Sequence, residues 1–228
     1  MSACMKRLLT HNHILLLQGK MGTFFCRFAS FLMGQGKTVH KINFNAGDAF
    51  FYCHKDNMDN YRGKPEEFDE FLQDIIDKHQ IDAVVCFNDC RPYHDVAQIV
   101  CSVNGVSLFV FEEGYLRPDY ITLEEHGING YSQLDPALIN TLKRANDKPK
   151  YTANRFWRLC VASIIYYIVV FFGRGHYPYY QHYRGLTIWQ EAGAWLIAPV
   201  RKVWRYLPDK RLEKQLIGGG ANFYLVSL

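Results

Sequence analysis

The sequence lacks the cysteine spacing of a metal site or of a disulfide scaffold. Its seven cysteines are scattered along 228 residues, are odd in number, and include no CxxC pair. Several of them, such as Cys86, lie in apolar runs, where a free cysteine behaves as a small hydrophobic residue. The sequence therefore predicts neither a zinc site nor a disulfide framework, and this cysteine usage fits a reducing cytoplasm.

A secretory leader and a P-loop are also absent. Lys6 and Arg7 lie near the amino terminus, but a His-Asn-His sequence at residues 11–13 breaks the apolar run, so we predict no signal peptide. Residues 36–38 (Gly-Lys-Thr) resemble the end of a P-loop, yet Phe31 stands where that motif needs its first glycine. The segment also follows a predicted helix rather than a strand. These departures exclude a P-loop NTPase.

Acidic residues are scarce in one part of the chain. Residues 1–140 contain 12 Lys and Arg against 18 Asp and Glu, a balance of −6. Residues 141–215 contain 14 against 4, a balance of +10. Such a split predicts that the second segment faces an anionic partner, either a membrane surface or a nucleic acid. A basic helical face that simply lies in solvent explains the charge equally well.

The hydrophobic runs are too short for a confident membrane span. Residues 159–172 carry no charge, but crossing a bilayer takes about 20 apolar residues. Flanking arginines and interspersed aromatic residues suit a membrane interface, and a helix buried in a larger protein accounts for the run at least as well. Residues 187–206 predict an amphipathic helix that carries tryptophans together with Arg201, Lys202 and Arg205.

The first 115 residues alternate short apolar runs with longer periodic segments. The apolar runs predict strands at residues 14–17, 39–43, 82–87 and 106–111, and the periodic segments predict helices at 23–35, 65–79 and 95–103. Strands that alternate with helices predict an α/β fold, here a Rossmann-like parallel sheet with flanking helices. Functional groups are then expected in the loops at the carboxyl ends of the strands.

We predict three parts along the chain. Residues 1–140 form the Rossmann-like amino-terminal domain. Residues 141–217 form a basic, aromatic-rich helical segment that faces a membrane or another domain. Residues 218–228 form a glycine linker and the first strand of a second α/β domain, most of which we expect beyond this sequence.

Two loops after the first strands carry candidate binding residues. Gly19 and Gly22 follow a strand and open a helix, where backbone N–H groups bind anions, although a tight turn explains them as well. Asn43, Asn45 and Asp48 follow the second strand. Their amides and carboxylate suit the binding of sugar hydroxyls, and turn chemistry accounts for the same residue types equally well.

Asp89, Arg91 and His94 follow the third predicted strand, and together they exceed what a turn needs. The planar guanidinium of Arg91 suits bidentate binding of a phosphate or carboxylate. For His94, we favour a role at the start of the next helix over a catalytic one.

The most informative stretch follows the fourth strand, where Glu112 and Glu113 precede Arg117. Two carboxylates next to a buried strand are costly unless they are paired or used. Strand alternation points them in opposite directions, so that one can face the cleft while the other meets Arg117. Like Arg91, Arg117 is also a candidate to bind the phosphate or carboxylate of an anionic substrate. A carboxylate in such a cleft suits acid–base or nucleophilic work at a sugar's anomeric carbon. A structural Glu–Arg pair is the alternative, and we favour the functional interpretation.

At this point the sequence resembles the capsule polysaccharide biosynthesis and export family. The resemblance runs in order from Leu15 to Ser132 and continues more loosely to residues 182–184. It rests on several long motifs, which are Leu15-Leu16-Leu17-Gln18-Gly19, Val39-His40-Lys41-Ile42-Asn43-Phe44-Asn45, Asp89-Cys90-Arg91-Pro92-Tyr93-His94, Phe111-Glu112-Glu113-Gly114-Tyr115-Leu116-Arg117-Pro118-Asp119 and Gly127-Ile128-Asn129-Gly130.

The resemblance implies a two-domain GT-B glycosyltransferase of which this chain is the amino-terminal half. Such an enzyme would move β-linked Kdo, an eight-carbon acidic sugar, from CMP-Kdo to a phosphatidylglycerol-based lipid acceptor, with no other cofactor and no metal. Glu113 matches the second residue of the family's acidic pair and is therefore implied to be the catalytic carboxylate, beside Glu112. Related enzymes often have Asp there, and the nucleotide-binding segment belongs to the second domain.

The same resemblance sets the expected partners and location. We expect a CMP-sugar donor, a lipid acceptor, an anionic membrane surface and other capsule assembly proteins, with no nucleic acid. The protein is then cytoplasmic and peripheral on the inner membrane. The alternative, from a different class, is a non-catalytic subunit of the capsule polysaccharide assembly and export complex.

Overall fold

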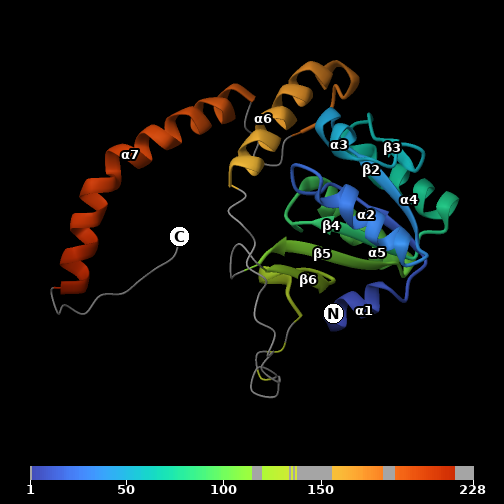
Figure 1. Ribbon diagram of the computed structural model, residues 1–228. Coiled ribbons are helices and arrows are strands. Elements are labelled where there is room, and N and C mark those ends of the chain that lie inside the picture. Colours follow the sequence, from blue (N-terminus) through green and yellow to red (C-terminus); the bar gives the residue numbers. More distant parts are fainter. Residues whose placement is uncertain are drawn as a thin grey trace. The chain divides into compact units, whose positions relative to one another are not determined.

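The computed structural model describes residues 2–114, 120–133, 135, 137, 156–181 and 188–218. Contacts divide the chain into two units, Met1–Tyr183 and Arg184–Leu228. The first unit contains the sheet, and the helix α7 (Ile188–Gly218) belongs to the second (Figure 1). Residues 156–181 thus group with the sheet, whereas the sequence grouped them with the helical segment that follows.

The first unit is built on a six-stranded sheet with the order β3-β2-β1-β4-β5-β6. The first five of these strands in spatial order are parallel, and β6 runs antiparallel to β5 at the edge. The strands are β1 (His13–Leu16), β2 (Thr38–Asn43), β3 (Met58–Asn60), β4 (Ala83–Phe87), β5 (Ser107–Glu113) and β6 (Ile121–Glu125). The predicted α/β fold with a Rossmann-like, mostly parallel sheet is confirmed.

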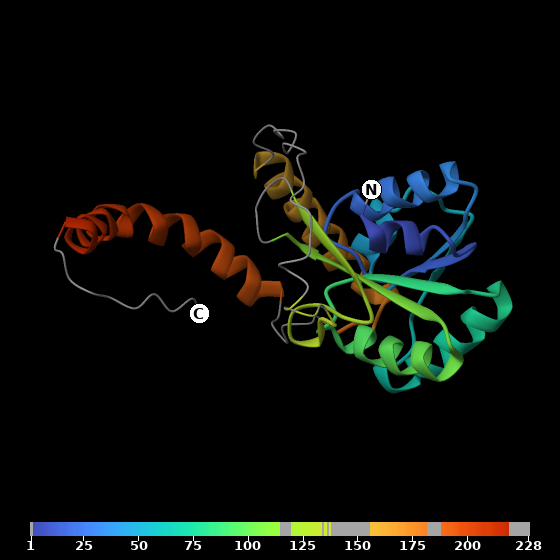
Figure 2. The ribbon, with the colours of Figure 1, turned by 90° about the horizontal axis from the view of Figure 1, so that it is seen from below.

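Each face of the sheet is covered by helices, as the continuous apolar runs of the central strands require. Alternate residues enter opposite cores, so that Leu15 packs with α4 (Phe68–His79) and α5 (Pro92–Asn104). Ile14 and Leu16 pack on the other face with α1 (Ala3–Leu8) and α2 (Phe24–Gly34). Figure 2 shows these two layers of helices on either side of the strands.

Sequence signals at the helix ends explain the two long helices of one face. A 3-10 turn, η1 (Pro65–Glu67), leads into α4, which ends where Gln80 adopts a left-handed φ of 51°. The helix α5 begins at Pro92, three residues earlier than predicted, and Gly105 ends it with a φ of 65°. Both helices were predicted, but α4 begins at Phe68 rather than at residue 65, and α5 begins earlier than predicted.

A short helix, α3 (Ala46–Phe51), forms where the sequence suggested a loop. Asn45 caps it, because its Oδ1 accepts a hydrogen bond from the Asp48 backbone N–H at 2.9 Å. The residue types that favour turns are thus used here to start a helix at the carboxyl end of β2.

The apolar helix α6 (Phe156–Gly173) packs against α3. Close approach is possible because both contact points are small: a Cβ on Gly47 would lie 2.5 Å from the Tyr166 ring, and one on Gly173 would lie 2.2 Å from Ala46 Cβ. By length and composition, the segment Arg158–His176 could cross a membrane, with a mean hydropathy of 1.5 and 17% of the tested window buried. A part of this helix nevertheless packs against α3 of the sheet unit.

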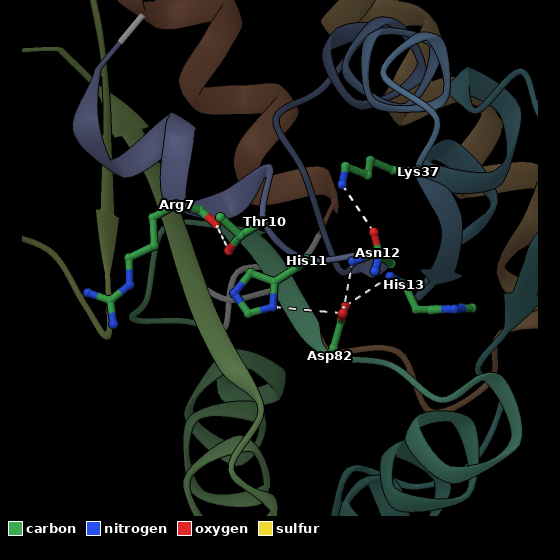
Figure 3. Close-up of polar contacts among 7 residues, drawn as sticks. All are labelled: Arg7, Thr10, His11, Asn12, His13, Lys37 and Asp82. Carbon is green, nitrogen blue, oxygen red and sulfur yellow. Dashed lines mark hydrogen bonds and ion pairs between the residues drawn. The ribbon is translucent and has the colours of Figure 1, made fainter.

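Polar contacts fix the amino end of the sheet (Figure 3). Asp82, which precedes β4, accepts hydrogen bonds from the backbone N–H groups of Asn12 at 2.8 Å and His13 at 2.9 Å. Lys37 donates to Asn12 Oδ1 at 3.2 Å. These contacts align β1, β2 and β4 at one end, so that their other ends meet at a common edge.

The structure contains a disulfide that the sequence analysis did not predict. Cys26 in α2 is bonded to Cys53, with the two Cα atoms 5.4 Å apart. The prediction of no disulfide is wrong at this pair. The two cysteines are 27 residues apart, a spacing that does not by itself indicate a disulfide. The two sulfurs meet because α2 packs beside the residues that follow α3.

A candidate active site at the carboxyl edge of the sheet

The strand order places a topological switch point between β1 and β4. From β1 the chain proceeds to β2 and β3 on one side, and then returns to β4 and β5 on the other. Ligands in sheets of this kind bind outside the carboxyl ends of the strands at such a point. Four of the segments that follow strands meet there, beginning with Leu17, Phe44, Asn88 and Gly114.

The loop after β1 is shaped by its two predicted glycines. Gly22 has a φ of +101°, which L-residues rarely adopt. At Gly19 a Cβ would lie 2.7 Å from the Phe25 ring, so the close packing of loop and helix requires a glycine. Arg91, from the loop after β4, donates to the Gly19 carbonyl oxygen at 3.4 Å. The two loops at the switch point are thus joined directly.

Behind this loop lies a buried polar cluster centred on the Asp48 carboxylate. Its Oδ2 accepts hydrogen bonds from the side-chain amides of Gln18 and Asn45, both at 3.2 Å. Its Oδ1 accepts one from the Tyr166 hydroxyl at 3.2 Å. Gln18 also donates to Tyr180 at 3.2 Å, so residues far apart in the sequence converge on one carboxylate.

Lys41 is a buried amine on β2, next to this cluster. Its Nζ donates to the carbonyl oxygens of Leu17 at 3.2 Å and Ile42 at 3.0 Å. Burial lowers the pKa of Lys41 to about 8, although the nearby Asp48 carboxylate opposes the shift. Burial likewise raises the pKa of Asp48, and Lys41 and Arg91 oppose that shift. Each group therefore limits the cost of burying the other.

The glycine loop and the polar cluster line a small pocket that is partly open to solvent. Its walls come from the β1–α2 loop, β2, α3 and α6. The residues that carry its chemistry are Gly19, Lys20, Gly22, Lys41, Asp48 and Tyr166. Two amines and one carboxylate in a partly closed space suit an anionic ligand that also has hydroxyl groups.

Glu113 lies beside this pocket at the end of β5. Its Oε1 forms an ion pair with Nζ of Lys20, and both side chains are about one-third exposed. Glu112 points differently, because its Oε1 accepts a hydrogen bond from the Glu113 backbone N–H at 2.9 Å. The two adjacent carboxylates are thus held by different partners. The expected partner of Glu112, Arg117, lies outside the described residues.

Two other predicted residues are held by contacts with the framework. Asn43 donates to Asn60 Oδ1 at 3.2 Å and so joins β2 to β3. Asp89 accepts from the Ile128 backbone N–H at 2.8 Å and fixes the chain after β6. Through these hydrogen bonds Asn43 and Asp89 have structural roles next to the site.

His94 is buried in the first turn of α5, with its Nδ1 2.5 Å from the Asn88 carbonyl oxygen. Burial lowers its pKa to about 3, and the positive charge of Arg91 acts in the same direction. A neutral imidazole here holds the β4–α5 turn, in which Asn88 has a left-handed φ of 68°. This geometry agrees with the favoured role at the start of the helix.

The sequence analysis did not propose Gln18, Lys20, Lys41, Tyr166 or Tyr180 as site residues. A signal existed for Gln18, a polar residue directly after an apolar run, and for Lys41, a charged residue within a predicted strand. Lys20 lies between the two predicted glycines. No local signal marks Tyr166 and Tyr180, which reach the site only because α6 and the segment after it pack against α3.

Fold and site together define a Rossmann-type α/β unit with a cationic pocket and a carboxylate at its switch point. Comparison with known proteins identifies the family. Residues 82–228 match the family model described as capsule polysaccharide biosynthesis protein, and the chain belongs to this family.

Curated relatives agree with this assignment. The chain is 40% identical over 230 residues to the capsule polysaccharide modification protein LipB of Neisseria meningitidis serogroup A, which covers 95% of this chain and 54% of that protein. It is 36% identical over 221 residues to the capsule polysaccharide export protein KpsS of Escherichia coli, covering 92% and 54%. The chain thus spans about half the length of these relatives, and a role in capsule biosynthesis is supported.

One solved structure shows a slight likeness, the Bordetella bronchiseptica enzyme WbmH in complex with NAD+. It has a TM-score of 0.33 and 18% identity over 42% of this chain and 36% of that one. A likeness of this extent carries no argument about the site. The fold assignment depends on the strand order itself.

Proposed function

We propose that the chain is the amino-terminal half of a GT-B glycosyltransferase of capsule synthesis. The proposed reaction transfers β-Kdo from CMP-Kdo to a phosphatidylglycerol-based lipid acceptor. The observation that carries the proposal is the position of Lys20, which lines the pocket and also pairs with Glu113. A carboxylate with a cation at its side, at the switch point of the sheet, is an arrangement suited to sugar transfer.

The pocket's charges fit the proposed substrates. Donor and acceptor both carry phosphate, and the sugar carries a carboxylate, so amines such as Lys20 and Lys41 offer favourable contacts. Glu113 would either accept the proton of the acceptor hydroxyl or attack the anomeric carbon as CMP leaves. The polar side chains of Asn45 and Asp48 stand near the same pocket, where hydroxyl recognition is needed.

The test is a transfer assay with CMP-Kdo and a lipid acceptor, using the protein together with its second half. Glu113→Gln keeps size and hydrogen bonding but removes the charge, and we expect turnover to fall about 10²- to 10⁴-fold. Glu70→Gln, an exposed change on α4, is the matched control and should leave turnover unchanged. Near-normal turnover of the folded Glu113→Gln protein would refute the assignment.

A non-catalytic role remains the second candidate, because the Escherichia coli relative is described as an export protein. In that case the pocket would bind lipid-linked polysaccharide without turning it over. Binding of such a ligand by the wild-type protein, with no release of CMP in the transfer assay, would favour this function over the enzyme.

We also propose that the protein binds the cytoplasmic surface of the inner membrane. The side of α6 that faces away from α3 exposes large apolar residues, among them Val161, Ile164, Ile168 and Phe172. The helix α7, described by itself, exposes Trp204 among basic residues. Apolar side chains with nearby cations suit peripheral binding to anionic lipid, to which each basic residue contributes about 1 kcal/mol.

Vesicle flotation distinguishes this from a solvated basic face. Binding should require anionic lipid, fall as salt rises, and weaken when residues Arg201, Lys202 and Arg205 are changed together to Gln. Removing the same charge from the sheet unit, at Lys37, Lys64 and Lys78, provides the matched control. Binding that ignores both lipid charge and salt would contradict the proposal.

A further inference from the structure

A group of three possible metal ligands lies near the β3 edge of the sheet. His40 comes from β2, Asp59 from the edge strand β3, and His79 is the last residue of α4. In the parallel pairing of β2 with β3, Ile42 lies opposite Asp59. Because side chains alternate along a strand, His40, Ile42 and Asp59 share one face of the sheet.

The helix α4 brings the third residue to the same face. Leu72, Ile75 and Ile76 of α4 are buried in the core that also contains Ile42. His79 follows Ile75 and Ile76 by four and three residues, so it continues the buried stripe of the helix by one turn. The fold therefore directs His79 toward His40 for the same reason that it buries the rest of the stripe.

The three ligand atoms are close together. Nε2 of His40 is 2.7 Å from Oδ2 of Asp59, and Nε2 of His79 is 4.0 Å from the same oxygen. All three lie within 4.8 Å of one another, and the two imidazole rings stack with centroids 4.0 Å apart. Nε2 of His79 is buried and has no hydrogen-bond partner among the described residues. A buried polar atom without a partner is unusual, and a bound ion or water is one explanation for it.

We propose that His40, Asp59 and His79 form a binding site for a divalent first-row transition metal, with Zn²⁺ as the best match. Two imidazole nitrogens and one carboxylate oxygen are ligands that Zn²⁺ prefers, whereas Mg²⁺ and Ca²⁺ favour oxygen alone. Asp59 is 35% exposed, which leaves room for water as a fourth ligand. Around a tetrahedral ion, the ligand atoms lie about 3.4 Å apart, so each observed separation from Oδ2 changes by less than about 1 Å.

The site is separate from the candidate active site. The next residue, Lys41, points to the opposite face of β2, where it lines the pocket. Metal binding at His40 would instead tie the three-residue edge strand and the end of α4 to β2. The proposal does not depend on the proposed function.

The direct experiment is titration of the metal-free protein with Zn²⁺ in competition with a chromophoric chelator. We expect one equivalent to bind and the melting temperature to rise with it. His79→Gln and Asp59→Asn should each weaken binding by at least about 100-fold, the upper end of the loss caused by removing an outer-sphere partner. His126→Asn removes an exposed imidazole at a left-handed φ of 72°, which Asn tolerates, and should change nothing.

Two further measurements keep the proposal open to refutation if a variant does not fold. Co²⁺ should give visible ligand-field bands without the charge-transfer band of a thiolate ligand. In the wild-type protein, Zn²⁺ should shift the imidazole NMR signals of two histidines and leave the other seven in place. Absence of stoichiometric binding would show that His40 and Asp59 are only a hydrogen-bonded pair. Thiolate bands, or full affinity in folded His79→Gln, would also overturn the site.

Discussion

The contact that fixes α6 on the sheet unit can be tested at a single oxygen atom. The Tyr166 hydroxyl accepts a hydrogen bond from Asn45 Nδ2 at 2.7 Å and donates one to Asp48 Oδ1 at 3.2 Å. Tyr166→Phe removes both contacts and leaves the ring in place against Gly47. Because all three residues are buried, water cannot easily replace the missing hydroxyl.

The magnitude follows from the groups that lose a partner. Leaving one buried polar group unsatisfied costs about 1–3 kcal/mol. Asp48 keeps its other donors at Oδ2, among them Gln18, so we expect about 2 kcal/mol in total rather than the full cost for two groups. Urea unfolding of the wild-type and Tyr166→Phe proteins measures this difference directly.

Tyr179→Phe is the matched control, because Tyr179 is 48% exposed in the turn after η4 (Arg174–His176). It should change the free energy of unfolding by less than about 0.5 kcal/mol. Hydrogen exchange adds a second measurement, since Tyr166→Phe should reduce protection in α6 before it does so in β1 or β4. Equal stability of the two variants, with unchanged exchange in α6, would refute the docking argument.

Two other predictions concern the same framework. The pKa of His94 is lowered to about 3 from the ordinary 6.5, so between these pH values the unfolded chain binds more protons than the folded chain. The free energy of unfolding therefore falls as pH falls through this window, by up to about 1.4 kcal/mol per pH unit. His94→Asn, whose Nδ2 can keep the bond to Asn88, should flatten this part of the pH profile, and an unchanged slope would contradict the assignment. Gly47→Ala should lower the free energy of unfolding by about 1–3 kcal/mol, because the added Cβ would overlap the Tyr166 ring. Gly34→Ala, which places its Cβ in open space, is the control and should be nearly neutral in thermal unfolding. Equal effects of the two changes would count against the close packing of α6.

The sequence predicted the parts of the fold that depend on strong local patterns. The four short runs that predicted strands became β1, β2, β4 and β5. The signal was clearest in β1, β4 and β5, because strands buried on both faces are mostly hydrophobic. The missed strands lack such a pattern. The strand β3 is Met-Asp-Asn, three residues at an edge, and β6 is an antiparallel edge strand whose residues are half-buried or exposed. Their pairing comes from the neighbouring strand rather than from their own composition.

The candidate site was predicted in outline, because parallel topology alone brings the ends of the strands together. Gly19, Gly22 and Asp48, which the sequence singled out as binding residues, line the pocket of the structure. The ion pair of Lys20 with Glu113 spans 93 residues and depends on the order β1-β4-β5, which local patterns do not determine. The same holds for Tyr166, which meets Asp48 across 118 residues through the packing of α6 on α3.

The strand β2 shows which sequence signal would have revealed more. His40 and Lys41 are consecutive polar residues in a strand with a core on each face, so they must point to opposite sides. Burying either group without partners is costly, and two such residues therefore require two separate polar environments. The structure supplies both: Lys41 meets two carbonyl oxygens at the pocket, and His40 meets Asp59 near the sheet's edge. Two consecutive polar residues in a strand that is covered on both faces thus indicate a polar environment on each of its sides.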